Sequence, residues 1–325
     1  MKTLRTLQHV LGNRLKEDES LARFTTLKIG GPADLFYEAH TTDELHNAMV
    51  TAKNHHIPIT VLGGGSNILV GDKGIRGLVI RNMTNAISIR GLKGNIKSGT
   101  NKKTVFVQAD SGVSMNKLVR FTIDEGLAGL EMQLGLPGSV GGALYMNSKW
   151  TNPVGYVGDV VYQATILTKK GEIATVPASY FRFGYDQSII QDSGDVVLRV
   201  VFALIQKSKD ELWERANASI AYRRQSQPQG ILSAGCTFRN ITHAEALSVP
   251  TPNHTTSAGY LLDHAGLKGE SVGDAQFSPI HANFIINRGR ASASDVVTLI
   301  ERAREKVFSQ FGVKLKEEIV RIGEF

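Results

Sequence analysis

The sequence predicts an α+β fold with two domains. Short β-branched or alternating apolar runs, punctuated by glycine, dominate the first two-thirds of the chain, and longer helical patterns follow Ile205. Strands and helices are thus clustered rather than strictly alternating, which is typical of the α+β class. The length of 325 residues also fits two domains of ordinary size. Because the character of the sequence changes near Ile205–Lys209, we expect a first domain over residues 1–206 and a second over 207–325.

Strands are expected mainly in the first domain. Each is a short apolar or β-branched run bounded by glycine or polar residues. The segment TVFVQAD alternates with a period of two, as a strand buried on one face should. The expected strands of this domain are Leu35–Ala39, Ile59–Gly63, Leu78–Arg81, Val105–Asp110, Val160–Thr168 and Val196–Ile205.

Helices are expected where apolar residues recur at three- and four-residue spacing behind a polar N-cap. Two interrupt the strands of the first domain: one follows Thr41, and one follows Ser114 and stops at Gly126. In the second domain, a capping box at 208–211 opens a helix to about Arg224. A long helix then runs from about Ser294 to Gly312, and the apolar strand Ile319–Ile322, expected to return to the first domain, closes the chain.

Composition narrows the class of protein. The chain is 42% apolar and 21% charged with 33 glycines, which is typical of a loop-rich globular protein. No window approaches eighteen consecutive apolar residues, and the charged N-terminal segment lacks the apolar region of a signal peptide. A single cysteine excludes an intrachain disulfide. We therefore expect a cytoplasmic protein without membrane insertion.

The net charge of +7 is mostly interleaved with acidic residues. One basic run is an exception, because no acid interrupts it, but glycines break it up and it has no aromatic residue to stack on a base. A solvated loop or hairpin is the favoured interpretation over nucleic-acid binding. Such a charge excess also tolerates anionic ligands such as a diphosphate. The run comprises Arg90, Lys93, Lys97, Lys102 and Lys103.

Two glycine-rich segments are candidates for phosphate binding. Gly63-Gly64-Gly65-Ser66-Asn67 follows an expected strand, so successive backbone N–H groups are free to converge on an anion. It matches neither a dinucleotide fingerprint nor a P-loop, and an ordinary glycine turn is the alternative. In the second segment, GLPGSVGGA at 135–143, small residues again permit close backbone approach, with a role in packing as the alternative. The presence of both segments favours a large phosphate-bearing cofactor.

Two further segments carry reactive side chains. Cys236 stands among small residues in SAGCTFRN, where a buried small hydrophobe is the alternative to a reactive thiol. Histidines lie in the same domain but match no zinc motif, so no metal site is expected. Near the C-terminus, Glu317 is expected to be solvated. Glu318, next to the apolar run, is a candidate acid held in a pocket.

These segments together resemble one family, the flavin-dependent UDP-N-acetylenolpyruvoylglucosamine reductases, also called UDP-N-acetylmuramate dehydrogenases. The resemblance runs in colinear order from Thr25 to Gly323 and fits the shorter subtype of the family. The segments that carry it are TTLKIGGPA at 25–33, GGGSN at 63–67, GLPGSVGGALYMN at 135–147, FGY at 183–185, QP at 227–228, SAGCTFRN at 233–240, AGYLL at 258–262, GDAQ at 273–276, HANFIIN at 281–287 and EEIVRIG at 317–323.

The resemblance implies an FAD-binding domain of the vanillyl-alcohol-oxidase type in two parts, followed by a substrate domain. It implies that NADPH reduces FAD, and that the enolpyruvyl group of UDP-N-acetylglucosamine enolpyruvate is then reduced to the lactyl ether of UDP-N-acetylmuramate, a precursor of peptidoglycan. The implied partners are this substrate and NADPH, with no nucleic acid, and the protein is expected to be a monomer. Hydride addition leaves an enolate beside a carboxylate, so cations and a positioned proton donor suit the chemistry.

Site residues carry over position by position. Cys236 occupies the position of the family's proton-donating serine, and its thiol, with an ordinary pKa of about 8.5, is still protonated at neutral pH. Glu318 corresponds to the glutamate that assists the enolate or its protonation. The implied substrate contacts are Tyr185, Arg223, Asn240 and Gln276. The implied FAD contacts are Gly63, Gly64, Gly65, Ser66, Asn67, Ile68, Gly138, Ser139, Gly141 and Gly142.

One position departs from the family pattern. Where the family reads Gly-Tyr-Arg-x-Ser, with an arginine for the substrate carboxylate and the enolate, this chain has Asp186. The change places a negative charge where a positive one is needed. Either Arg182 reaches in, or Arg223 or Arg239 takes over, or the reductase step is lost. The alternative function is therefore a relative that binds flavin and a UDP-sugar but has an impaired or lost reductase step.

Overall fold

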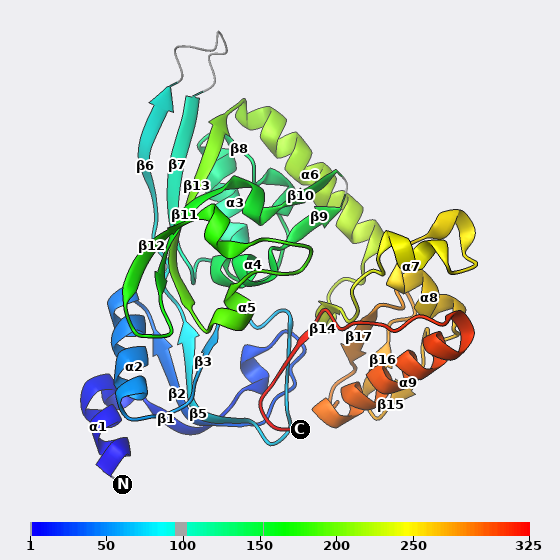
Figure 1. Ribbon diagram of the computed structural model, residues 1–325, viewed down its shortest axis with the longest axis horizontal. Helices are drawn as coiled ribbons and strands as arrows, with labels where there is room; N and C mark the ends of the chain where they lie inside the picture. The colour runs from blue at the N-terminus through cyan, green and yellow to red at the C-terminus, as the bar shows by residue number, and fades with distance from the viewer. Residues whose placement is uncertain (1, 95–102, 152) are drawn as a thin grey trace. The chain divides into compact units, whose positions relative to one another are not determined.

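The computed structural model describes residues 2–94, 103–151 and 153–325 and confirms the α+β class (Figure 1). The chain divides into two compact units that interleave along the sequence. Unit 1 comprises Met1–Lys16, Phe36–Gly64 and Leu78–Arg223, and unit 2 comprises Glu17–Leu35, Gly65–Gly77 and Arg224–Phe325. The domain boundary expected near Ile205 stays a prediction.

The larger sheet of unit 1 is antiparallel. Its strand order is β12-β11-β13-β7-β6, with β8 also paired to β13. The period-two pattern in β7 is confirmed, because Val105, Val107 and Ala109 are buried while Phe106 and Gln108 on the opposite face are half-buried. The strands are β6 (Ile87–Gly94), β7 (Lys103–Asp110), β8 (Leu127–Ala128), β11 (Val161–Leu167), β12 (Ile173–Pro177) and β13 (Val196–Gln206).

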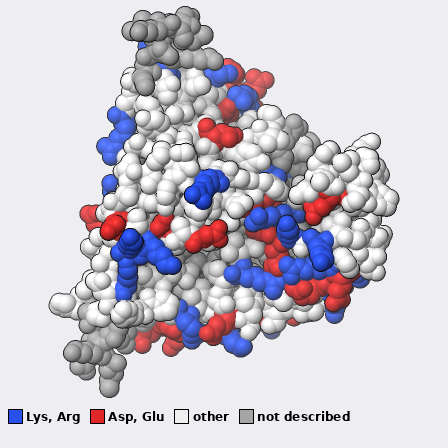
Figure 2. Space-filling model, viewed as in Figure 1, with Lys and Arg blue, Asp and Glu red and all other residues white. Residues whose placement is uncertain are grey.

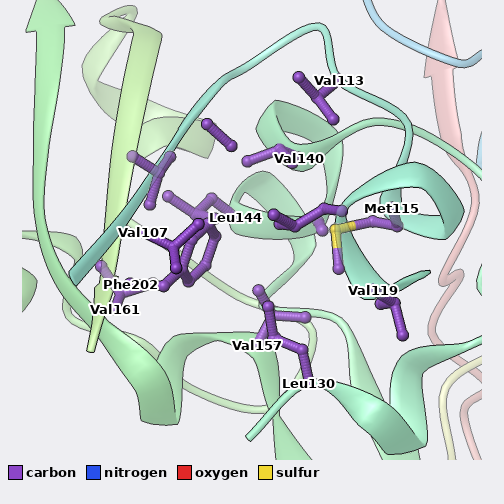
Figure 3. Packing of buried hydrophobic residues seen from close by; sticks show 14 of the residues in the cluster. Val107, Val113, Met115, Val119, Leu130, Val140, Leu144, Val157, Val161 and Phe202 are labelled. Carbon is purple, nitrogen blue, oxygen red and sulfur yellow. The ribbon is translucent and has the colours of Figure 1, made fainter. Parts of the chain in front are cut away.

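Helices α3 (Met115–Asp124) and α4 (Val140–Met146) supply side chains to the apolar core of unit 1. Figure 3 shows Met115 of α3 and Leu144 of α4 directed toward the same core as Val107 and Phe202 of the sheet. Both helices begin at a serine whose side chain accepts a backbone N–H, as N-caps do. The core therefore fixes the start of α4, which lies within the second glycine-rich segment.

A second sheet has the order β1-β2-β5-β3, in which β3 pairs in parallel with β5. Helix α2 begins at the expected Thr41 N-cap. A helix at the N-terminus and the short hairpin of β9 and β10 were not predicted. The elements are α1 (Lys2–Leu11), β1 (Lys16–Ser20), β2 (Pro32–Ala39), α2 (Thr42–Asn54), β3 (Ile59–Leu62), β5 (Ile75–Asn82), β9 (Lys149–Thr151), β10 (Val154–Tyr156) and α5 (Ile190–Ser193).

Unit 2 combines a small antiparallel sheet with helices. The sheet has the order β14-β17-β16-β15, and β18 pairs in parallel with β4. The long helix expected near the C-terminus is α9 (Ala293–Phe311), which starts at a capping box of Ser292 and Asp295 and ends at Gly312 with a positive φ. The other elements are β4 (Ile68–Val70), β14 (Leu232–Cys236), α7 (His243–Leu247), α8 (Ala258–His264), β15 (Ser271–Val272), β16 (Ala275–Phe277), β17 (Phe284–Asn287) and β18 (Val320–Ile322).

Two expectations concern elements at the surface. Helix α6 (Lys209–Ser226) begins where the sequence indicates, and Glu211 in its first turn accepts from Lys207 at 2.7 Å, while the capping box at 208–211 stays a prediction. The arms of the basic run form the antiparallel pair of β6 and β7, so the hairpin interpretation fits. Lys97 and Lys102 lie outside the described residues.

Charged side chains of both signs lie close together on one face of the molecule. On the face drawn in Figure 2, Lys and Arg side chains lie beside Asp and Glu side chains. In the part of the chain that the structure describes, no helix is both long and apolar enough to cross a bilayer.

We expect Phe202→Ala to lower the free energy of unfolding by about 3–5 kcal/mol, because the ring is fully buried and its loss leaves a cavity. Ile205→Ala in the same strand is the control, since Ile205 is 39% exposed, and should cost below about 1 kcal/mol. Urea denaturation measures both, and equal costs would contradict the packing described here.

Candidate functional site

The two glycine-rich segments meet in unit 1. A Cβ on Gly64 would lie 2.6 Å from the Cα of Gly138, and a Cβ on Gly63 would lie 2.3 Å from the Ser139 Oγ. Real Cβ atoms essentially never approach other atoms within 3.0 Å, so the two backbones touch only because side chains are absent. Two separate candidates in the sequence thus lie against each other in the fold.

The second segment is anchored by backbone hydrogen bonds to the turn before α3. The N–H of Met115 donates to the Gly138 carbonyl at 3.0 Å, and the N–H of Gly141 donates to the Ser111 carbonyl at 2.7 Å. Gly138 has a φ of +104°, which favours glycine. The Ser139 hydroxyl accepts the N–H of Gly142 at 3.3 Å and starts α4. These hydrogen bonds fix the second glycine-rich segment against the residues at the start of α3.

The rest of the first segment lies in unit 2, where Thr26 and Asn67 connect it to other strands. Thr26 donates its N–H to the Gly65 carbonyl at 3.0 Å and its hydroxyl to the Ser233 carbonyl of β14 at 2.7 Å. Asn67 donates its side-chain amide to the Glu318 carbonyl at 3.0 Å, and its own carbonyl accepts from Val320 at 2.9 Å. The GGGSN turn is therefore bonded to the segments that carry Cys236 and Glu318.

Cys236 and Glu318 occupy neighbouring backbone segments of unit 2. The N–H of Glu318 donates to the carbonyl of Thr237 at 2.8 Å, and Phe238 forms an antiparallel bridge with Glu317. Both expected side chains are half-buried. Residues that are 82 positions apart in the sequence (318 minus 236) thus come together as an acid and a thiol on adjacent segments.

Proteins of similar sequence match nearly the whole chain. A family model described as FAD binding domain matches residues 33–177, and one described as UDP-N-acetylenolpyruvoylglucosamine reductase, C-terminal domain, matches residues 227–322. A protein of that name from Agathobacter rectalis is 39% identical over 96% of this chain and 95% of its own length. This chain belongs to the UDP-N-acetylenolpyruvoylglucosamine reductase family.

Other members of the reductase family agree in extent and in fold. The reductase from Halalkalibacterium halodurans is 34% identical over 100% of this chain and 98% of its own. The solved structure of the reductase from Thermus caldophilus superposes with a TM-score of 0.72 at 32% identity, covering 94% of this chain and 97% of the other. The match spans both units, so the resemblance inferred from separate motifs extends to the whole fold.

The glycine surface fits FAD, the cofactor of this reductase family. Side chains at Gly63 and Gly64 would clash with Ser139 and Gly138, so glycine at both positions lets the two loops lie together. Glycine-rich loops of this kind bind a diphosphate through successive backbone N–H groups rather than through fixed charges. No group of histidine, cysteine and acidic side chains with metal-binding geometry occurs among the described residues.

Sequence reasoning missed Asn283, which fixes the Cys236 loop. Its buried side chain accepts from the N–H of Phe238 at 2.9 Å and donates to the Phe238 carbonyl at 2.8 Å, and its own carbonyl accepts from Thr237 at 2.7 Å. Burial lowers the pKa of the His281 imidazole below its usual value, and its Nδ1 accepts from the Asn283 N–H at 3.2 Å. The motif HANF contains both His281 and Asn283, but only the fold shows that Asn283 is hydrogen-bonded to Phe238.

Asn240 and Gln276 have structural partners within unit 2. The Asn240 side chain accepts the N–H of Ala258 at 3.1 Å, close to the start of α8. The Gln276 amide donates to the Gly269 carbonyl at 3.0 Å. One end of the Asn240 amide and one end of the Gln276 amide are therefore hydrogen-bonded within unit 2. These bonds orient the opposite end of each amide. Their contacts with a UDP-sugar stay predictions.

Glu317 differs from its expected solvated state. Its carboxylate accepts from Arg304 at 2.6 Å and from Arg321 at 2.7 Å, and its side chain is only 15% exposed. Glu301 and Glu317 both lower the energy of the Arg321 cation, so although burial opposes it, the pKa of Arg321 is raised. The ion pairs fix the backbone beside Glu318 and leave Glu317 as a structural group.

Asp186 lies in a tight turn of unit 1. It is 4% exposed and has a φ of +51°, and its carbonyl accepts from the side chain of Gln191 at 3.0 Å. Gly184 and Gln187 bridge across the turn. Arg182 is exposed and ends a 3₁₀ turn with a left-handed φ of 46°. The acid at 186 is thus buried in the fold rather than displayed on a flexible loop.

Aromatic rings surround the neighbouring cations in unit 1. The Lys149 Nζ lies 3.6 Å from the centroid of the Tyr185 ring. The Arg223 guanidinium lies 4.6 Å from the centroid of Trp150, whose ring meets Tyr222 edge-on at 5.8 Å. Both expected substrate residues, Tyr185 and Arg223, are therefore engaged in cation–π contacts. Lys149 was not predicted, because the sequence offers no signal that pairs it with Tyr185.

We expect Gly64→Ala to weaken FAD binding by about 10- to 100-fold, since its Cβ would force the Gly138 backbone away and overpacking of this kind costs about 1–3 kcal/mol. Gly91→Ala is the matched control, because a Cβ there meets nothing within 4 Å. Titration of the flavin-free protein with FAD measures both. Equal affinities in the two variants would count against the role of the glycine contact.

We expect Asn283→Asp to lower the free energy of unfolding by about 1–3 kcal/mol, because the buried Phe238 carbonyl loses its donor. The loosened loop should also raise the rate at which Cys236 reacts with a thiol reagent. Asn54→Asp, at an exposed position at the end of α2, is the control. A stable variant with an unchanged thiol rate would show that Asn283 does not hold the loop.

Proposed function

We propose that this protein catalyses the NADPH-dependent reduction of UDP-N-acetylglucosamine enolpyruvate to UDP-N-acetylmuramate through bound FAD. Membership of the reductase family over nearly the full chain supports this activity. The observation that carries it is the juxtaposition of the Cys236 and Glu318 segments, joined by the Glu318–Thr237 hydrogen bond and linked through Asn67 to the first glycine segment. The product places the enzyme in the synthesis of peptidoglycan precursors.

The flavin, when bound, accepts a hydride from NADPH and delivers it to the methylene carbon of the enolpyruvyl group. For binding the FAD diphosphate, the proposed residues offer backbone N–H groups and two polar side chains, and the contact of Gly64 with Gly138 supports their joint use. The proposed FAD contacts are Gly63, Gly64, Gly65, Ser66, Asn67, Ile68, Gly138, Ser139, Gly141 and Gly142.

Reduction of the carbon–carbon double bond also needs a proton at the carbon next to the carboxylate. We assign this proton to the Cys236 thiol, because an ordinary thiol with a pKa of about 8.5 is protonated at neutral pH. A thiol is a stronger acid than the serine hydroxyl it replaces. Glu318, on the neighbouring segment, is assigned to the enolate or to its protonation.

Binding of the UDP-sugar is assigned to four side chains. Tyr185 and Arg223 belong to unit 1, and Asn240 and Gln276 belong to unit 2, where one end of each amide is already bonded. We assign FAD binding to residues 1–206 and substrate binding to 207–325, with the final strand returning to the FAD side. A cytoplasmic location and a monomeric state complete the proposal.

We expect Cys236→Ala to lower kcat by about 10²- to 10⁴-fold, the usual contribution of a positioned acid, while Cys236→Ser retains most of the activity. Both side chains are similar in size to the thiol, so the binding of UDP-N-acetylglucosamine should be unchanged. Steady-state oxidation of NADPH measures kcat. Full activity in the alanine variant would remove Cys236 from the reaction.

The activity itself is tested by incubating the FAD-loaded protein with NADPH and UDP-N-acetylglucosamine enolpyruvate. The proposal expects NADPH oxidation in equal amount to a product heavier by two hydrogen atoms, identified by mass spectrometry. UDP-N-acetylglucosamine, which lacks the enolpyruvyl group, is the control substrate and should consume no NADPH beyond the rate with oxygen alone. Failure to form the reduced product would refute the proposed function.

A further inference from the structure

Unit 1 holds an ammonium group against the ring of Tyr185. The Lys149 Nζ lies 3.6 Å from the ring centroid, well within the range of a cation–π contact. The backbone of Lys149 is fixed in β9, where it pairs with Tyr156 of β10. A lysine side chain ordinarily samples many rotamers, but here its two ends are both constrained. Its charge is thus held at a defined position beside residue 185.

Among the described residues, no acidic side chain forms an ion pair with Lys149. Ion pairs recorded for the described residues neutralise many of the basic side chains, but none of them involves Lys149. The side chain is half-buried, so its charge is only partly screened by water. An ammonium in this state favours an anion, and no carboxylate of the described chain supplies one.

The place of this turn in the sequence points to the anion. Asp186, next in sequence to Tyr185, is 4% exposed and stands where the family pattern has an arginine for the substrate carboxylate. Arg182 is exposed to solvent at the end of a 3₁₀ turn, and Arg223 lies against Trp150. Of these three cations, Lys149 is the one that contacts the ring adjoining position 186.

We propose that Lys149 binds the carboxylate of the enolpyruvyl substrate, with the Tyr185 ring positioning its ammonium. The inference rests on the proposed function and goes beyond it by naming the group that replaces the arginine expected at 186. A charge-assisted bond from an ammonium to a carboxylate strengthens as negative charge develops on the neighbouring carbon during reduction. Lys149 therefore acts in substrate binding and again when the enolate forms.

Calorimetric titration of the FAD-loaded protein separates carboxylate recognition from recognition of the UDP-sugar. The two ligands are UDP-N-acetylmuramate, which carries a carboxylate, and UDP-N-acetylglucosamine, which does not. We expect Lys149→Met to weaken binding of the first by about 10- to 100-fold and to leave the second unchanged. Lys149→Arg should restore most of the loss, and Lys149→Gln provides a second neutral variant should the methionine variant fold poorly.

Lys314→Met is the matched control, since Lys314 also lies over an aromatic ring, that of Phe308 at 5.9 Å. It should change the affinity for neither ligand. Tyr185→Leu, which removes the ring, should weaken UDP-N-acetylmuramate more than Tyr185→Phe, which keeps it. In kinetics, Lys149→Met should raise KM and lower kcat together.

Four results would overturn the inference. Unchanged affinity for UDP-N-acetylmuramate in the neutral variants would remove Lys149 from binding. An equal loss for both ligands would show that Lys149 recognises the UDP-sugar or supports the fold. If the unsubstituted protein binds neither ligand, the proposed function is refuted as well. If the unsubstituted protein and both neutral variants turn over the substrate equally well, only the role of Lys149 is refuted.

Discussion

Close contact between two stretches of backbone, at 63–64 and 138–139, sets the geometry on which the rest of unit 1 depends. A Cβ at Gly64 would come within 2.6 Å of the Gly138 Cα, so the first loop can occupy its place only because residue 64 lacks a side chain. The loops are held there by larger structures: β3 leads into the first, and α4, packed in the unit 1 core, follows the second. Packing far from the cofactor surface therefore determines whether backbone N–H groups can face a diphosphate.

Unit 2 uses hydrogen bonds for the same purpose. Thr26 and Asn67 connect the remainder of the first glycine segment to β14 and to the segment of Glu318, and Asn283 fixes the residues after Cys236. Three short polar side chains thus align segments that are far apart in the sequence. Cys236 and Glu318 therefore lie on backbone that is hydrogen-bonded to neighbouring segments, which favours a constant distance between their side chains.

The sequence alone predicted the helices and strands that are determined by neighbouring residues. Alternation predicted β7, and N-caps with a terminating glycine predicted α3 and α9, because these features depend on neighbouring residues alone. The glycine segments and Cys236 were found for the same reason. Tertiary contacts were not accessible in this way. The pairing of Lys149 with Tyr185 and the clamp formed by Asn283 depend on residues 36 and 45 positions apart, with no periodicity to connect them (185 minus 149, and 283 minus 238).

The acid at position 186 is the feature that most affects the proposed reaction. The fold and the sequence agree with the reductase family, whereas Asp186 departs from the pattern expected of that family. The cation at Lys149 removes this conflict without a change in backbone. A reductase with a relocated cation keeps both half-reactions, and a protein that has lost the cation keeps only the first.

Anaerobic rapid-mixing absorbance measurements on the FAD-loaded protein test this claim most directly. NADPH is first added until the absorbance of the oxidised flavin disappears, and UDP-N-acetylglucosamine enolpyruvate is then mixed in. The account predicts that the oxidised absorbance returns fully with the enolpyruvyl substrate and does not return with UDP-N-acetylglucosamine. Bleaching by NADPH without any return on addition of the enolpyruvyl substrate would contradict it, because the cofactor half would then be intact and the substrate half inactive.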